Sequence, residues 1–174
     1  SIILYDTSTI WAFSRLGGKI DSRIVRKTFN VRESAKPETL YTPVTVSRTL
    51  PGRSTFIADG CPDLTNGVNL VLDSGATLVI PDNCWIDINK NSSLEMRAGS
   101  SLVLGSGSYI DVGQSSPGRL IVNARAGWRA SIKSANASNP AGDAHVVTLH
   151  SDAGGSDIRG LDLGVVLRGV AEAV

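Results

Sequence analysis

Two pairs of chemically useful side chains stand 24 residues apart. Asp87 and Asp111 form one pair and Trp85 and Tyr109 the other, because the tetrapeptide WIDI recurs as YIDV. Hydrolysis of a polysaccharide needs two carboxylates on one sugar bond, about 5 to 9.5 Å apart. Aromatic rings beside carboxylates are typical of sugar-binding surfaces, since rings pack on pyranose faces while acids accept hydroxyl protons.

Each pair also has a purely structural interpretation. The two acids alternatively form a solvated ladder that keeps one outer face of the protein soluble. The two aromatics alternatively form a contact with another subunit or a loop, since exposed rings also mark interfaces. We therefore name Asp87 and Asp111 as the catalytic candidates, and Trp85 and Tyr109 as the candidate binding residues.

A repeat of eight residues predicts the elements that position these side chains. Three columns of one parity hold small or apolar residues: Val68, Ala76, Cys84, Ser92, Ser100 and Ser108; Leu70, Leu78, Ile86, Leu94, Leu102 and Ile110; Leu72, Ile80, Ile88, Met96, Leu104 and Val112. Because strand side chains alternate between faces, each repeat predicts a short strand with one buried face. A corner column favours the left-handed backbone region: Gly75, Asn83, Asn91, Gly99 and Gly107.

Eight residues per strand and corner fit either an antiparallel meander or a solenoid whose turn takes three repeats. The corners lack the Asn-Gly or Asp-Gly pairs that tight hairpins favour. The 24-residue echo favours the solenoid, so we predict an all-β, three-sided parallel β-helix over residues 67–174. No polar cap follows, so we expect its C-terminal end to be incomplete or to dock onto the virion or a second chain.

Residues 1–66 do not share the period and are predicted to form an N-terminal attachment or capping section. Ser8 begins a predicted short helix that Gly17 and Gly18 end. An alternating strand is expected around Val44, and a second strand over residues 54–58. The section from Arg15 to Arg53 is basic but has no nucleic-acid-binding motif, so we expect no nucleic-acid partner.

Composition limits the remaining possibilities. The chain has 174 residues with 41% hydrophobic, 5% aromatic and 18 glycines, which predicts one domain of many short strands with an aliphatic core. No apolar run is long enough to span a membrane. Cys61 and Cys84 lack metal-type spacing, and we interpret them as small apolar fillers, which leaves the redox compartment open.

His145 and His150 flank a predicted strand, and Asp152 and Asp157 follow. No fixed spacing makes these groups converge on a metal ion, so their role is interpreted as structural. We expect neither a metal nor any other cofactor.

Segments 75–81 (GATLVIP), 145–149 (HVVTL) and 156–163 (SDIRGLDL) resemble coils of the pectate-lyase-like right-handed β-helix superfamily. The resemblance covers about 100 residues, 68 to 170, and within that superfamily it is greatest to bacteriophage tailspikes and tail fibres. It implies a right-handed coil and contact with cell-surface polysaccharide. The calcium and arginine constellation of pectate lyases and the paired acids of polygalacturonase-like hydrolases are not matched, so no catalytic residue is carried over.

The expected function is therefore the structural and receptor-binding part of a phage-type spike, a homotrimer on the virion or otherwise extracellular. One alternative is the N-terminal portion of a polysaccharide lyase or glycoside hydrolase. Another is a secreted bacterial β-helix adhesin, which an oxidised pair of Cys61 and Cys84 would favour.

Overall fold

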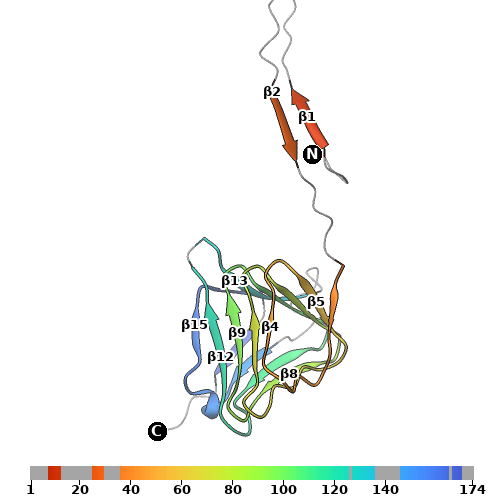
Figure 1. Ribbon diagram of the computed structural model, residues 1–174. Helices are drawn as coiled ribbons and strands as arrows, with labels where there is room; N and C mark the ends of the chain where they lie inside the picture. The colour runs from red at the N-terminus through yellow and green to blue at the C-terminus, as the bar shows by residue number, and fades with distance from the viewer. Residues whose placement is uncertain are drawn as a thin grey trace, which may run out of the picture. The chain divides into compact units, whose positions relative to one another are not determined.

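The computed structural model describes residues 8–12, 25–29, 36–125, 127–135, 146–164 and 166–169 (Figure 1). The chain divides into two compact units, residues 1–36 and 37–174. Among the described residues, no helix is both long and apolar enough to cross a membrane.

The first unit contains a strand where a helix was predicted. Strands β1 (Ser8–Ala12) and β2 (Val25–Phe29) pair antiparallel. The helix prediction from Ser8 is therefore wrong. Residues 9–11 (TIW) are β-branched or aromatic and suit a strand once a partner is present. Such a short helix is marginal without tertiary contacts. Gly17 and Gly18 lie outside the described residues.

The second unit is built of short strands and one 3-10 turn, η1 (Ser151–Ala153). The strands are β3 (Glu38–Leu40), β4 (Arg48–Leu50), β5 (Thr55–Ala58), β6 (Asn69–Leu72), β7 (Thr77–Ile80), β8 (Trp85–Ile88), β9 (Ser92–Arg97), β10 (Ser101–Leu104), β11 (Tyr109–Val112), β12 (Gly118–Asn123), β13 (Ala130–Ser134), β14 (Val146–Leu149), β15 (Asp157–Arg159), β16 (Leu161–Gly164) and β17 (Val166–Gly169).

These strands form three sheets in which the pairs are parallel. Sheet 1 has the order β16-β13-β10-β7-β5-β3, sheet 2 the order β17-β14-β11-β8, and sheet 3 the order β15-β12-β9-β6-β4. From β6 onward the chain visits sheets 3, 1 and 2 in a constant cycle (Figure 1). The antiparallel meander is thereby excluded, and the predicted three-sided parallel β-solenoid is confirmed.

The solenoid begins earlier than the predicted boundary at residue 67. Strands β3, β4 and β5 already belong to sheets 1 and 3, and isolated bridges from Val44 to Leu64 and from Leu64 to Ile88 continue the line of sheet 2. These first coils are shorter, since Glu38 pairs with Phe56, 18 residues on. The eight-residue period is therefore absent from a segment that nevertheless coils.

The strand expectations outside the repeat have different outcomes. The strand over 54–58 is confirmed as β5, whereas Val44 makes only an isolated bridge and the neighbouring strand is β4. The sequence also predicts strands at 120–122, 128–132, 145–149 and 165–167, which correspond to β12, β13, β14 and β17, although residues 145 and 165 lie outside the described part of the chain. The single strand predicted over 158–163 is instead split into β15 and β16, which belong to sheets 3 and 1.

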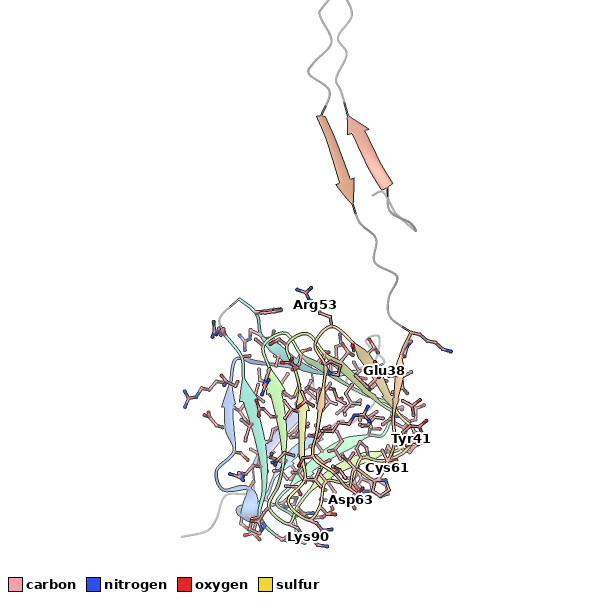
Figure 2. The ribbon with its side chains drawn as sticks, in the orientation of Figure 1. Glu38, Tyr41, Arg53, Cys61, Asp63 and Lys90 are labelled. Atoms are coloured by element: carbon pink, nitrogen blue, oxygen red, sulfur yellow. A yellow bond between two sulfur atoms is a disulfide. The ribbon has the colours of Figure 1, made fainter. Side chains whose placement is uncertain are left out.

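Inward aliphatic columns form the core. Leu70, Leu94 and Leu120 lie in register on sheet 3, and each has 0% of its surface exposed. In β6 on sheet 3 and β8 on sheet 2, exposed or half-buried positions alternate with buried ones. Side chains from all three sheets fill the interior (Figure 2). Each coil thus buries its apolar face against the coils beside it.

The corners between strands follow the predicted Gly/Asn column. All five corner residues have positive φ, from 53° at Asn83 to 78° at Gly75. The small column beside them also helps to close the corners, because Ser92 Oγ accepts a bond from the Val68 amide (3.1 Å) and Ser108 Oγ one from the Cys84 amide (3.2 Å). Small polar residues therefore satisfy backbone amides where the chain bends.

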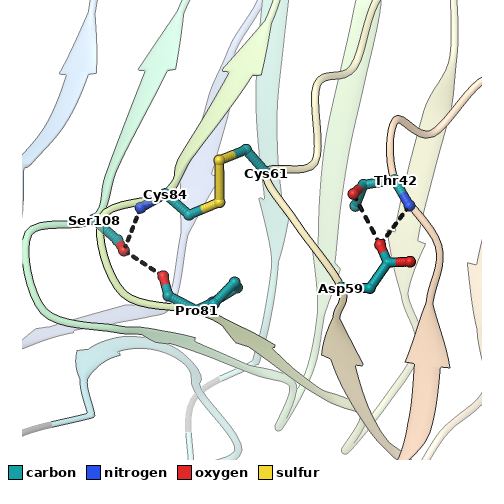
Figure 3. Close-up of a disulfide and its surroundings, with 6 residues drawn as sticks. All are labelled: Thr42, Asp59, Cys61, Pro81, Cys84 and Ser108. Carbon is teal, nitrogen blue, oxygen red and sulfur yellow. Dashed lines mark hydrogen bonds between the residues drawn. A yellow bond between two sulfur atoms is a disulfide. The ribbon is translucent and has the colours of Figure 1, made fainter.

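A disulfide joins two successive coils. Cys61 and Cys84 are 23 residues apart, about one coil, and their Cα atoms are 5.0 Å apart (Figure 3). The interpretation of both cysteines as apolar fillers is therefore wrong. Parallel stacking brings residues one coil apart side by side, within the Cα separation that a disulfide requires.

One glycine tests how closely the corners pack. A Cβ at Gly118, the first residue of β12, would overlap the backbone carbonyl oxygen of Ile88. We expect Gly118→Ala to lower the free energy of unfolding by at least about 2 kcal/mol, because neither backbone can move freely. Gly154→Ala is the matched control, since a Cβ there meets nothing within 4 Å. Equal urea-unfolding midpoints for the two variants would contradict this packing.

The disulfide gives a second stability prediction. We expect the double variant Cys61→Ala/Cys84→Ala to be less stable than the oxidised protein by about 3 kcal/mol, the chain-entropy value for a loop of this length. Reductant should lower the melting temperature of the wild type and leave that of the variant unchanged. An oxidised wild type that melts with the variant would show that the bond constrains nothing.

Candidate functional site

The outer face of sheet 2 carries a stacked aromatic pair. Trp85 on β8 lies in register with Tyr109 on β11, and 45% and 37% of their surfaces are exposed. The ring centroids are 6.1 Å apart and the ring planes are inclined by 17°. Their neighbours Ile86 and Ile110 point inward and are fully buried, so strand alternation fixes both rings outward. We call Trp85 and Tyr109 the aromatic pair.

Beside the aromatic pair runs a column of carboxylates. Asp87 and Asp111 lie in register on β8 and β11, whose backbones are about 4.8 Å apart as hydrogen-bonded neighbours. Asp63 precedes Leu64, which bridges Ile88 and donates its amide to the Asp87 carbonyl oxygen (2.8 Å). Asp63 therefore lies one coil before Asp87. We call Asp63, Asp87 and Asp111 the acid column.

Polar neighbours hold the acid column. The Asn89 side-chain amide is 3% exposed and donates to Asp87 Oδ1, while its own Oδ1 accepts a bond from the Ser115 amide (3.3 Å). His150 Nε2 lies 3.3 Å from Asp111 Oδ1. In the described part of the chain, Asp63 Oδ1 is buried without a hydrogen-bond partner. Asn89 and His150 thus offset part of the repulsion between the acids.

The central acid is electrostatically perturbed. Partial burial raises the pKa of Asp87, and the negative charges of Asp63 and then Asp111 raise it further. The bond from Asn89 and the nearby His150 act in the opposite direction. Because desolvation and like charges both disfavour its carboxylate, Asp87 holds a proton more readily than an exposed aspartate does.

The structure brings together the residues that the 24-residue echo paired. Trp85 contacts Tyr109, and Asp87 neighbours Asp111. Asp63 was missed, although it stands 24 residues before Asp87 and the same spacing would have found it. The sequence predicted a structural role for His150. Its contact with Asp111 spans a coil of irregular length, so the 24-residue period could not predict it.

This face is chemically suited to hydroxylated ligands. The aromatic pair offers apolar area, and the acid column offers acceptors for hydroxyl protons. His145 lies outside the described residues, and within the described ones no group of histidine, cysteine and acid side chains has the arrangement of a metal site.

The raised pKa of Asp87 predicts that replacing this carboxylate stabilises the protein, and that the gain depends on pH. The pKa of Asp87 is higher in the folded protein than in the unfolded chain, where it is about 3.9. Below about pH 3.9 the carboxyl is protonated in both states, so its charge does not affect the free energy of unfolding. As pH rises from there through the folded pKa, the free energy of unfolding falls. We expect Asp87→Asn to melt higher than the wild type at neutral pH and to converge with it below about pH 4. Asp152→Asn, an exposed acid outside the column, is the control. A lower neutral-pH melting temperature for Asp87→Asn would show that the charge is net stabilising.

Comparison with protein-family models, with curated proteins and with solved structures found no match to this chain. The three parallel sheets establish a parallel β-solenoid and no family. The function of the protein is therefore inferred from the residues on the outer face of sheet 2.

Proposed function

We propose that this protein is a structural module that binds a cell-surface polysaccharide through the outer face of sheet 2. The observation that carries the proposal is the aromatic pair, in register and exposed, with the acid column on the same two strands. Rings of this kind supply large contact area at small entropic cost, and carboxylates fix the orientation of sugar hydroxyls.

The charge of the face selects the kind of glycan. Three aspartates in one column repel an anionic polymer, and the burial of Asp87 makes any further negative charge nearby more costly. Neutral sugars instead donate hydroxyl hydrogens to the same oxygens. We therefore propose a neutral polysaccharide as the ligand of this face.

The setting is proposed to be extracellular, as part of a virion spike or fibre or as a secreted bacterial adhesin. Stacked coils give a rigid shaft, and disulfides persist in oxidising surroundings, which supports a location outside the cytoplasm. We propose a homotrimer as the assembled form of the spike, for which light scattering should give a mass of three chains.

The runner-up is a polysaccharide depolymerase. It is favoured by one observation, the raised pKa of Asp87 next to the in-register Asp111. A protonated acid beside an ionised one is the pairing that glycoside hydrolysis uses, and retaining enzymes hold the two about 5 to 5.5 Å apart.

The binding proposal is tested with a matched pair of tryptophan variants. Neutral oligosaccharides are screened on a glycan array, and the best ligand is titrated by calorimetry. We expect Trp85→Ala to weaken binding about tenfold or more, the equivalent of about 1.4 kcal/mol for a lost ring contact. Trp128→Ala, which removes an exposed tryptophan between β12 and β13, should leave the affinity unchanged.

Two outcomes would overturn the proposal: no neutral glycan binds, or both tryptophan variants bind as the wild type does. New reducing ends in the incubated glycan, lost in Asp87→Asn/Asp111→Asn, would instead establish the depolymerase.

A further inference from the structure

A cavity of about 230 Å³ opens at the corner between sheets 3 and 1, and it uses no residue of the aromatic pair or acid column. It is lined by Ser74, Arg97, Ala98, Asn123, Arg125 and Trp128. Two arginines, an asparagine and a tryptophan therefore line one concave surface.

The corner is built from three successive coils. The chain turns here between β6 and β7, between β9 and β10, and between β12 and β13. The third turn is the longest, because β12 ends at Asn123 and β13 begins at Ala130. Within it Arg125 and Trp128 form an isolated antiparallel bridge, and the Trp128 amide donates to the Arg125 carbonyl oxygen (3.1 Å). The insertion thus forms one wall of the cavity.

Gly99 sets the position of the indole. A Cβ at Gly99 would overlap the ring of Trp128, and the φ of Gly99 is +72°, so the turn of the second coil leaves room for the ring only because it has no side chain. The indole is nevertheless 54% exposed. Trp128 therefore has support on one side and accessible apolar area on another.

The two arginines of the cavity differ in their partners. Arg97 Nε lies 2.8 Å from Glu95 and its Nη1 lies 3.2 Å from Asp73, so Arg97 is fully paired and these three side chains together carry one net negative charge. Arg125 is exposed, and among the described residues it forms no ion pair. A guanidinium without an acid partner is suited to a carboxylate, which it binds through two parallel hydrogen bonds.

We infer that this corner binds a single acidic pyranose of the hexuronate type. Its carboxylate pairs with Arg125 and accepts from the Asn123 amide, and its apolar ring face packs on Trp128. The cavity is below the range of about 300–1,000 Å³ typical for larger ligands, which matches one ring rather than a chain segment. The inference is independent of the proposed neutral-glycan face on sheet 2.

The test follows the indole N–H resonances by NMR while three probes are added to the full chain. Sodium glucuronate carries both a ring and a carboxylate, glucose carries the ring alone, and acetate carries the carboxylate alone. We expect glucuronate to shift the Trp128 resonance in a saturable manner, and we expect salt to weaken this binding. Glucose and acetate should each shift it much less at the same concentration.

Two variants separate specific binding from a general anion effect. Arg125→Gln should weaken glucuronate binding about tenfold or more without changing the response to glucose. Trp85→Ala, the control on sheet 2, should leave the glucuronate affinity unchanged. No Trp128 shift, equal shifts from acetate and glucuronate, or unchanged affinity in Arg125→Gln would overturn the inference. Each of these results leaves the neutral-glycan measurement on sheet 2 unaffected.

Discussion

Parallel, in-register hydrogen bonding between successive coils is the constraint on which the rest of this protein depends. It places each residue directly beside the one a coil away, so a position repeats its environment along the whole stack. Inward positions then need residues that pack on their own kind, and Leu70, Leu94 and Leu120 meet this need with no exposed surface. Outward positions are stacked in register in the same way, but there the residue type is not restricted by packing in the core.

Outward columns consequently concentrate whatever chemistry they carry. Two aromatic rings stack in register, and partial burial together with the charges of Asp63 and Asp111 raises the pKa of Asp87. At the corner after sheet 3 the rule instead joins opposite charges, since Arg97 lies one coil beyond Asp73 and pairs with it. There the backbone amide of Ser74 and then Arg97 lower the pKa of Asp73. The same stacking therefore places like charges together in the acid column and opposite charges together at Asp73 and Arg97.

Departures from a constant coil length create the individual features. The disulfide between Cys61 and Cys84 spans 23 residues, one fewer than the step that joins Leu64 to Ile88 in the same coil. The longer turn between β12 and β13 carries Trp128 and Arg125 out over the preceding corner. A further lengthening before β14 places His150 against Asp111. The regular coils supply rigidity, and the irregular ones supply the side chains that make these sites distinct.

Where the coils are equal in length, the periodicity of the chain is enough to predict the coil. Between residues 68 and 112 a constant 24-residue step predicted the strands, the corners and the partnering of Trp85 with Tyr109 and of Asp87 with Asp111. Four features could be seen only in the folded chain: the pairing of β3 with β5, the strand at Ser8–Ala12, the disulfide, and the contact of His150 with Asp111. The reason is that a period records registry only while nothing is inserted or deleted. Once a coil changes length, which residues meet is set by backbone hydrogen bonding and core packing, and neither leaves a fixed spacing in the chain.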